Sequence, residues 1–238
     1  QAARKDSTYL FVTLSETVQG IELFQDPPKS YSGPPVVVDA TSTILSRPLD
    51  IASYGIVFAS GGKNVPAGVA VVIARKSLLE ETKKQHVVPQ VMDYRVNAGY
   101  VGSIFESKPN TPAIFPVYML GLVLDYIKEV EGGLVGVKSR LDQRVGEIYG
   151  VADAFPDFYL NTIHPDARSH MNAVFMLPSR EHEKEFVRQA NALGLLHLYG
   201  HPVSGGIRVT MYNWVRDESV AKVANFMYAF AKQYKQDL

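Results

Sequence analysis

The feature that most constrains this sequence is a series of short, continuous apolar runs bounded by turn residues. Three of them occupy Val36–Asp39, 55–60 and Ala70–Ala74. Such runs, without polar alternation, are typical of strands in α/β sheets, and the run 70–74 is expected to be buried on both faces. The stretch from Asp39 to Lys63 has about the length of a strand–helix–strand connection. We therefore expect an α/β fold for the first half of the chain.

Composition and charge exclude several classes of protein. The 238 residues suit one large domain or two small ones. Lysine and arginine number 24, as do aspartate and glutamate, so the net charge is zero and a basic nucleic-acid surface is not expected. The absence of cysteine excludes disulfides, thiolate metal sites and a cysteine nucleophile. No apolar stretch approaches the roughly 20 residues of a membrane span, so we expect no membrane partner.

The spacing of apolar residues changes after Pro112. An apolar stripe from Ile114 to Ile127 predicts a long helix, and Gly132 and Gly133 are expected to end it. Further helices are predicted at 134–152, 181–192 and 219–234, and short strands at 173–177, 197–199 and 207–211. This half reads as α+β, and we place the domain boundary between residues 131 and 132.

The first candidate for chemistry is Lys63, which follows a Gly-Gly pair and the run 55–60. A phosphate-binding P-loop is excluded, because Val57 and Asn64 stand where that motif needs glycine and serine or threonine. A lysine at a glycine-rich strand end can form a Schiff base with a carbonyl if its amine is partly desolvated. The alternative is an exposed loop lysine, and the spacing alone favours that alternative.

Asp39 and Arg208 are charged residues in apolar strand-like runs. Asp39 ends its run, where α/β sheets place ligands, and could hold a cation or a protonated ring nitrogen. It could equally be a helix cap or a turn residue. Arg208 needs a partner, which could be a substrate carboxylate or a structural aspartate or glutamate.

Metal and serine chemistry have little support in the sequence. His197 and His201 are four residues apart, but the glycines beside them argue against a shared helix face, so we expect no zinc site. The Gly-X-Ser-X-Gly motif of serine hydrolases is absent.

Several distinctive stretches follow one another between Leu10 and the C-terminus. They are Glu16-Thr17-Val18-Gln19-Gly20, the Asp-Ala-Thr-Ser-Thr-Ile-Leu-Ser-Arg-Pro run at 39–48, Gly62-Lys63-Asn64, Asn110-Thr111-Pro112, the Arg-Ser-His-Met-Asn run at 168–172, and Gly205-Gly206-Ile207-Arg208. In this order they resemble the phosphoserine aminotransferase family, which is of fold type I and depends on pyridoxal phosphate (PLP). The resemblance implies part of the PLP-binding large domain, a mostly parallel sheet with helices, in residues 1–131. A small α+β C-terminal domain would follow in residues 132–238.

The resemblance also implies cofactor-binding roles for five side chains. Lys63 matches the catalytic lysine that binds PLP through its amine and later moves the substrate proton. Asp39 matches the aspartate that pairs with the ring nitrogen and keeps it protonated. Thr17 matches the threonine at the phenolic oxygen of the cofactor. Asn110 and Thr111 match a pair that reaches the cofactor phosphate across a dimer interface.

Two further residues match substrate-binding positions. Arg208 matches the arginine that grips the substrate α-carboxylate, and His201 matches a histidine near the distal acidic group. The implied reaction transfers an amino group between glutamate and 3-phosphohydroxypyruvate, giving O-phosphoserine and 2-oxoglutarate in serine biosynthesis. The resemblance further implies a cytoplasmic homodimer with its active site at the subunit interface and no metal.

The sequence departs from the family pattern at three positions. Gly62 stands where the family usually has a glutamine that contacts the cofactor phosphate. Pro202 stands where the family usually has an arginine, so the distal pocket loses a cation. Ser15 replaces a usual asparagine, and the segment 94–108 is longer than usual.

The largest departure is at the beginning of the sequence, which starts at Gln1 rather than Met. Family members carry considerably more chain ahead of the Glu16-Thr17 match, including the turn that binds the cofactor phosphate and the aromatic that stacks on the ring. We therefore expect an enzyme lacking its N-terminal part. The alternative is an incompetent fragment that folds and dimerises without a complete PLP site. A third reading keeps the fold but changes the reaction, and the lack of cysteine disfavours a desulfurase.

Overall fold

The computed structural model describes residues 4, 6–29, 31–80, 88–99, 108, 110–202 and 205–234. Two compact units divide the chain. The first comprises Gln1–Thr13, Asp26–Thr41 and Leu49–Leu124, and the second comprises Leu14–Gln25, Ser42–Pro48 and Asp125–Leu238. Two short segments of the first half thus belong to the second unit. The domain boundary expected between residues 131 and 132 stays a prediction, and part of the long segment 94–108 lies outside the described residues.

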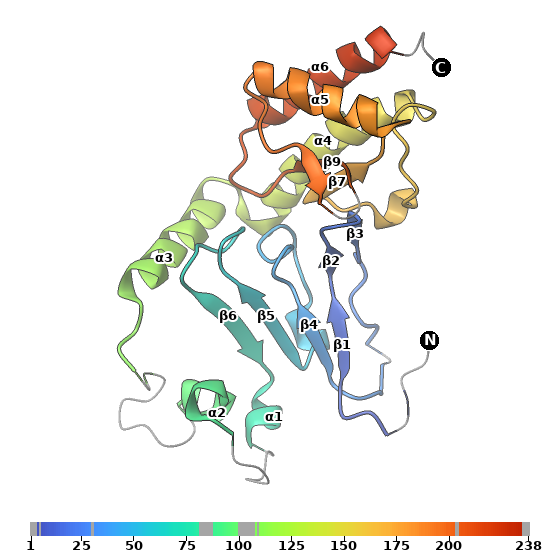
Figure 1. Ribbon diagram of the computed structural model, residues 1–238. Helices are drawn as coiled ribbons and strands as arrows, with labels where there is room; N and C mark the ends of the chain where they lie inside the picture. The colour runs from blue at the N-terminus through green and yellow to red at the C-terminus, as the bar shows by residue number, and fades with distance from the viewer. Residues whose placement is uncertain are drawn as a thin grey trace. The chain divides into compact units, whose positions relative to one another are not determined.

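A four-stranded sheet in the order β1-β4-β5-β6 forms the centre of the first unit (Figure 1). The strands are β1 (Leu10–Thr13), β4 (Val36–Asp39), β5 (Ile56–Ser60) and β6 (Ala70–Ala74). β1, β4 and β5 are parallel, and the register places Asp39 between Thr13 and Phe58. The carboxyl ends of these three strands therefore share one edge, as expected for an α/β fold.

Strand β6 departs from the sequence prediction of burial on both faces, which is wrong. None of its residues is buried, and Val72 and Ile73 are 42% and 39% exposed. β6 runs antiparallel to β5 and lies at the end of the sheet within the described residues. A continuous apolar run reports only that a strand is apolar, because its burial depends on the elements that cover it.

The connection between β4 and β5 differs from the strand–helix–strand connection expected from its length, since its only helical element is the 3-10 helix Ile51–Ser53.

The first unit has few helices of its own. They are α1 (Lys76–Glu80), the 3-10 helix Gln90–Met92, α2 (Tyr94–Asn97) and the beginning of α3 (Ile114–Glu129). The apolar stripe predicted for α3 forms, but Ile114 and Phe115 are each 71% exposed and only Ile127 of the stripe is buried. Gly132 and Gly133 follow with φ of 74° and 77°, a left-handed geometry that glycine adopts without strain. The helix ends at Glu129, close to the glycines as the sequence predicts, but Gly132 is the N-cap of the next helix and Gly133 its first residue.

The second unit is an α+β assembly (Figure 1). Its elements are the hairpin β2 (Ser15–Glu16) and β3 (Ile21–Glu22), then α4 (Gly133–Ala154), the 3-10 helix Pro165–Ala167, β7 (Asn172–Phe175), α5 (Arg180–Ala192), β8 (Tyr199–His201), β9 (Gly205–Thr210) and α6 (Asp217–Tyr234). The three later strands form an antiparallel sheet in the order β7-β9-β8. The helices predicted for this half and the strands predicted at 173–177 and 207–211 are therefore confirmed, with small shifts at their ends, whereas the strand predicted at 197–199 overlaps β8 only at Tyr199.

A single apolar core holds the second unit together. Val220, Val223, Met227 and Phe230 recur along α6 at helical spacing, and all four are buried. Phe186 of α5 meets Phe230 edge to face, with ring centroids 5.1 Å apart. The core therefore locks α5 and α6 together, as the apolar periodicity predicts.

Local sequence signals mark both ends of helix α5. The Ser179 hydroxyl accepts a hydrogen bond from the backbone N–H of His182 at 3.3 Å, and Glu181 and Glu183 occupy the first turn. Gly194 follows the helix with φ of 75°.

Along the part of the chain that the structure describes, no helix is both long and apolar enough to cross a membrane.

We expect Val137→Ala to destabilise the second unit by about 2 kcal/mol, because it removes two methyl groups from a fully buried side chain and leaves a cavity. Val135→Ala is the matched control, since Val135 lies on the same helix and is 70% exposed. The gain in helix propensity is common to both changes and cancels in the comparison. Urea unfolding followed by circular dichroism measures the difference, and equal effects of the two changes would contradict the burial of Val137.

Candidate functional site

The carboxyl edge of the parallel strands carries the first two candidate residues. Asp39 is the last residue of β4 and pairs in register with Phe58 of the neighbouring parallel strand β5. Lys63 follows the end of β5 by three residues. Parallel α/β sheets place their ligands at this edge, beyond the carboxyl ends of the strands. The topology therefore brings Asp39 and Lys63 to the same edge of one sheet.

Hydrogen bonds tie together the two segments that leave this edge. The backbone N–H of Ala40 donates to the Phe58 carbonyl at 2.8 Å, which extends the ladder beyond Asp39. The backbone N–H of Ser60 donates to Oγ1 of Thr41 at 3.1 Å. The segment after Asp39 is thereby fixed against the end of the strand that leads to Lys63.

The Asp39 carboxylate is half-buried and has a local structural role. Its Oδ1 accepts a hydrogen bond from the backbone N–H of Thr41 at 2.8 Å, which is the turn role foreseen as an alternative. Oδ2 has no hydrogen-bond partner among the residues that the structure describes. One oxygen thus orients the carboxylate while the other remains for a ligand, so the two roles are compatible.

The loop at Lys63 depends on its two glycines. A Cβ on Gly61 would lie 2.1 Å from the Pro66 carbonyl oxygen, so only glycine permits this close backbone approach. Gly62 has φ of 105°, where a larger residue would be strained, and its N–H donates to the Val65 carbonyl at 2.8 Å. Glycine at position 62, where the family usually has glutamine, therefore suits the turn conformation. Lys63 itself is half-buried, which satisfies part of the condition set for a reactive amine.

Asn110 and Thr111 lie just ahead of α3 in the first unit, and both are exposed. The loop beyond Lys63 approaches the start of this helix, because a Cβ on Gly68 would lie 2.9 Å from Cγ of Pro116. Proximity of Asn110 and Thr111 to a cofactor remains a prediction from the resemblance.

Thr17 lies in the second unit, at the turn of the hairpin β2–β3, and is half-buried. The Glu16 carboxylate fixes this turn, since its Oε2 accepts hydrogen bonds from the backbone N–H groups of Val18 and Gln19 at 3.0 and 3.1 Å. Gly20, just before β3, has φ of 77°, a left-handed conformation that completes the turn. The turn therefore holds the Thr17 backbone in one conformation.

Arg208 lies on β9, between the buried residues Ile207 and Val209. Because strand side chains alternate, Arg208 lies on the opposite face of the sheet from that core, and it is half-buried. Its Nε is buried and has no hydrogen-bond partner within the described part of the chain. Nor does a carboxylate there form an ion pair with it, so the structural partner considered as an alternative is not observed. His201 ends β8 and is half-buried.

The predicted site residues are therefore divided between the units. Asp39, Lys63, Asn110 and Thr111 belong to the first, and Thr17, His201 and Arg208 belong to the second. Within the first unit, the sheet brings Asp39 and Lys63 to one edge. No group of three or more metal-ligating side chains occurs in the described ranges.

The second unit contains a buried ionic cluster that the sequence did not predict. Glu22 of the hairpin is 1% exposed, and its Oε1 faces Nε of buried Arg47 at 3.5 Å. Its Oε2 accepts hydrogen bonds from the His170 backbone N–H at 2.9 Å and from the Ser169 hydroxyl at 3.3 Å. The only sequence signal was a lone glutamate in the run Ile-Glu-Leu-Phe, which gives no partner.

Burial dominates the electrostatics of this cluster. It raises the pKa of Glu22 above its usual value, although the His170 N–H and the Arg47 charge oppose the shift. Burial likewise lowers the pKa of the half-buried His170 imidazole, although Nδ1 lies 3.3 Å from the Asp142 carboxylate. The cluster joins the segment 14–25 to the segment 42–48 and to the body of the second unit.

Comparison of the sequence with known proteins identifies a family. The aminotransferase class-V family matches residues 2–223. The chain is 37% identical over 230 residues to the phosphoserine aminotransferase of Neisseria gonorrhoeae, covering 96% of this chain and 60% of that protein. It is 37% identical over 231 residues to that of Pseudomonas entomophila, covering 97% of this chain and 61% of that protein.

Comparison of the structure gives the same result. Phosphoserine aminotransferase from Bacillus circulans subsp. alkalophilus matches with a TM-score of 0.87 and 35% identity, over 97% of this chain and 62% of that one. PLP-bound phosphoserine aminotransferase from Trichomonas vaginalis matches with a TM-score of 0.84 and 32% identity, over 95% and 61%. The fold implied by the resemblance is confirmed. The chain spans about 60% of the length of the curated relatives it matches.

Glu22→Gln is expected to change the pH dependence of stability. Because the folded state raises the Glu22 pKa, the folded protein holds this proton more tightly than the unfolded chain does. The stability contributed by Glu22 is therefore present at low pH and falls as pH rises from about 4.5 through the raised pKa. The stability of the parent relative to Glu22→Gln should fall over this interval.

Urea unfolding of both proteins at several pH values measures this difference. Loss of the Arg47 partner adds an offset that does not depend on pH, since arginine stays charged throughout. A difference that is constant, or that grows in favour of the parent as pH rises, would show that burial does not raise the Glu22 pKa.

Proposed function

The chain belongs to the aminotransferase class-V family, and from this premise we propose that it acts in PLP-dependent amino transfer between glutamate and 3-phosphohydroxypyruvate. The products would be O-phosphoserine and 2-oxoglutarate, as in serine biosynthesis. The main support for this substrate pair is the identity of 37% to curated phosphoserine aminotransferases over nearly the whole chain. A cytoplasmic location follows from the same resemblance and stays a prediction.

The cofactor is assigned to the carboxyl edge of the sheet in the first unit. Lys63 would hold PLP through its amine and move the substrate proton, and Asp39 would pair with the ring nitrogen through the oxygen that Thr41 leaves available. When bound, PLP supplies an electron sink for the bond electrons at the substrate α-carbon. The half-buried position of both side chains fits these roles, because partial desolvation strengthens the charge pairing and favours a neutral amine.

The remaining cofactor contacts are assigned by the resemblance. Thr17 would meet the phenolic oxygen, which requires a defined turn, and the two hydrogen bonds to Glu16 provide one. Asn110 and Thr111 would reach the cofactor phosphate of a partner subunit, and their exposure agrees with such a contact.

Substrate recognition is assigned to Arg208, with His201 near the distal acidic group. The single observation that carries this assignment is the buried, unpartnered Nε of Arg208. A buried donor without a partner is costly, and a bidentate substrate carboxylate would satisfy it. Pro202, where the family usually has arginine, leaves the distal group with fewer cations than usual, so the affinity for a phosphorylated substrate is expected to be weaker.

A homodimer with the active site at the subunit interface forms part of the proposal. The first turns of α3 follow directly after Asn110 and Thr111, and their apolar side chains Ile114, Phe115 and Tyr118 are 60–71% exposed. Exposed apolar clusters of this kind mark interaction surfaces. Sedimentation equilibrium distinguishes the dimer from a monomer.

The alternative is a chain that folds and dimerises without a complete PLP site. The observation that favours it is that the matched relatives are considerably longer than this chain. This sequence matches about 60% of the length of those relatives. Cofactor binding by the chain alone therefore decides between the two proposals.

We expect the chain mixed with PLP to develop a visible absorption band and, after reduction with borohydride, a covalent adduct on the peptide that contains Lys63. Lys63→Met should abolish both, whereas Lys76→Met should leave both unchanged, because Lys76 begins α1 and is not assigned to the site. Absorption and peptide mass spectrometry provide the measurements. A folded circular-dichroism spectrum with neither band nor adduct favours the alternative.

Arg208→Ala is expected to lower kcat/KM for glutamate-dependent phosphoserine formation by about a hundredfold, because two charge-assisted hydrogen bonds to the substrate carboxylate are lost. Arg216→Ala is the matched control, since Arg216 is exposed and precedes α6. Coupled steady-state assays of product formation compare the two. Equal activity of Arg208→Ala and the parent would remove Arg208 from the carboxylate role.

A further inference from the structure

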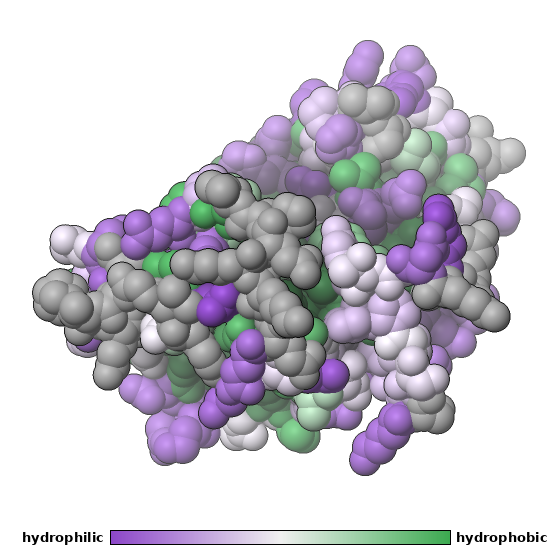
Figure 2. Space-filling model, turned by 90° about the horizontal axis from the view of Figure 1, so that it is seen from below, coloured by the Kyte–Doolittle hydropathy of each residue, from purple (hydrophilic) through white to green (hydrophobic). Residues whose placement is uncertain are grey.

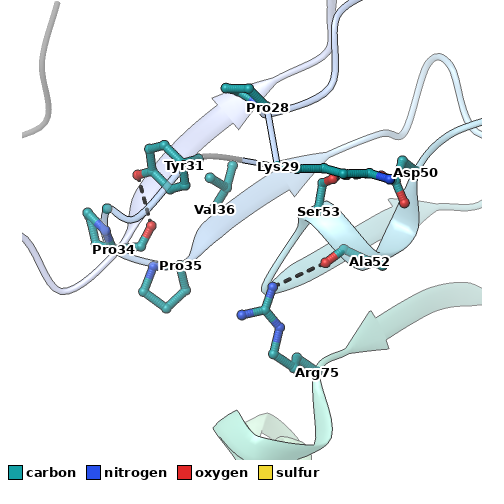
Figure 3. Close-up of a pocket in the computed structure, with 11 residues that line it drawn as sticks. Pro28, Lys29, Tyr31, Pro34, Pro35, Val36, Asp50, Ala52, Ser53 and Arg75 are labelled. Carbon is teal, nitrogen blue, oxygen red and sulfur yellow. Dashed lines mark hydrogen bonds between the residues drawn. The ribbon is translucent and has the colours of Figure 1, made fainter.

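A surface cavity of about 390 Å³ lies at the opposite end of β4 from the candidate site (Figure 3). Val36 begins β4 and lines the cavity, whereas Asp39 ends the strand. At a rise of about 3.3 Å per residue, these two residues are roughly 10 Å apart along the strand. All residues that line the cavity belong to the first unit. The cavity is therefore separate from the edge that carries Asp39 and Lys63.

Arg75 supplies a fixed cation in the wall of this cavity. Its Nη2 donates hydrogen bonds to the carbonyl oxygens of Ala52 and Tyr54, both at 3.2 Å, and Figure 3 shows the guanidinium reaching up toward Ala52. The backbone N–H of Arg75 is also held, by the Gly55 carbonyl at 2.8 Å. Nη1 and Nε have no partner among the described residues. Because Nη2 is engaged by both carbonyls, Nη1 supplies the N–H donors that remain for an anion, and the guanidinium supplies the positive charge.

Lys29 and Asp50 set the charge that the cavity accepts. Figure 3 shows the Lys29 side chain extending toward Asp50 and Ser53. Oδ2 of Asp50 accepts a hydrogen bond from the Ser53 hydroxyl at 2.8 Å. The charged side chains of the lining are the cations Lys29 and Arg75 and the carboxylate of Asp50, which together leave one net positive charge. This balance fits a ligand with a single negative charge, because Asp50 repels a second one.

The rest of the cavity wall is largely apolar and stiff. The Tyr31 hydroxyl donates to the Pro34 carbonyl at 2.9 Å, which fixes the orientation of the ring. Pro35 and Val36 continue this surface (Figure 3). Among the residues that Figure 2 colours, hydrophilic side chains predominate on this face, with smaller apolar patches among them. An apolar wall beside a fixed cation fits a ligand with an apolar body and one anionic group.

We propose that this cavity binds a small organic monocarboxylate. The carboxylate would accept a hydrogen bond from Nη1 of Arg75 with Lys29 nearby, and the apolar body would lie against Tyr31 and the proline rings. The volume is at the lower end of the range for small-molecule sites, which suits a molecule the size of benzoate. This site requires neither PLP nor the amino-transfer reaction.

Titration of the isotope-labelled chain with benzoate, followed by the backbone amide signals of Val36, Ala52 and Ser53, tests the proposal without PLP. Benzoate should shift these signals saturably, whereas benzyl alcohol, which has the same ring without the charge, should not. Inorganic phosphate should bind more weakly than benzoate, because it lacks the apolar body. Signals near Arg208 report separately on any carboxylate bound in the second unit.

Arg75→Gln should weaken benzoate binding about tenfold to a hundredfold, since it removes the positive charge and the charge-assisted hydrogen bond from Nη1. Lys76→Gln is the matched control and should bind benzoate like the parent. Lys76 is an exposed cation next to Arg75 in the sequence, but it does not line the cavity. If Arg75→Gln fails to fold, Lys29→Gln provides the second variant and should weaken binding several-fold. The proposal is overturned if these variants bind benzoate as tightly as the parent, or if benzyl alcohol binds as well as benzoate. It is also overturned if benzoate causes no saturable shift up to roughly tens of millimolar.

Discussion

The parallel pairing of β4 with β5 is the interaction on which the candidate site depends. It aligns Asp39 with Phe58, so the segments that leave the two strands start from the same edge of the sheet. The hydrogen bond from Ser60 to Thr41 then fixes these segments to each other. Without this register, nothing would place Asp39 near Lys63, because the residues between them form no continuous helix or rigid connection. The same pairing separates the carboxyl edge from the amino edge, where the Arg75 cavity lies.

In the second unit, the buried pair of Glu22 and Arg47 has a comparable organising role. Burying two charges costs several kcal/mol each, and the Ser169 and His170 donors offset part of that cost. The pair joins the segments 14–25 and 42–48, which the chain order places inside the first unit, to the body of the second. The hairpin that carries Thr17 is thereby anchored at its far end, while Glu16 orders the turn itself. Thr17 is thus held by local and by long-range contacts.

How well the sequence predicted each element depended on the range of the forces involved. Strand and helix positions were confirmed because apolar periodicity and turn glycines act within a few residues, as along α6 and at Gly132. The burial of β6 was predicted wrongly, because an edge strand and a central strand share the same apolar composition. The site roles of Lys63 and Asp39 came from family resemblance, since the spacing alone favoured a loop lysine and a turn aspartate.

The sequence by itself determined the class of fold, the three apolar strands of the first half, most elements of the second and the family, because these follow from local patterns and short motifs. Only the tertiary structure decided which residues are neighbours. It assigned two segments of the first half to the second unit, paired Glu22 with Arg47, and left the Nε of Arg208 buried without a partner. These outcomes depend on contacts between residues far apart in the chain. Their free energy comes from burial and desolvation, which no local pattern of residues records.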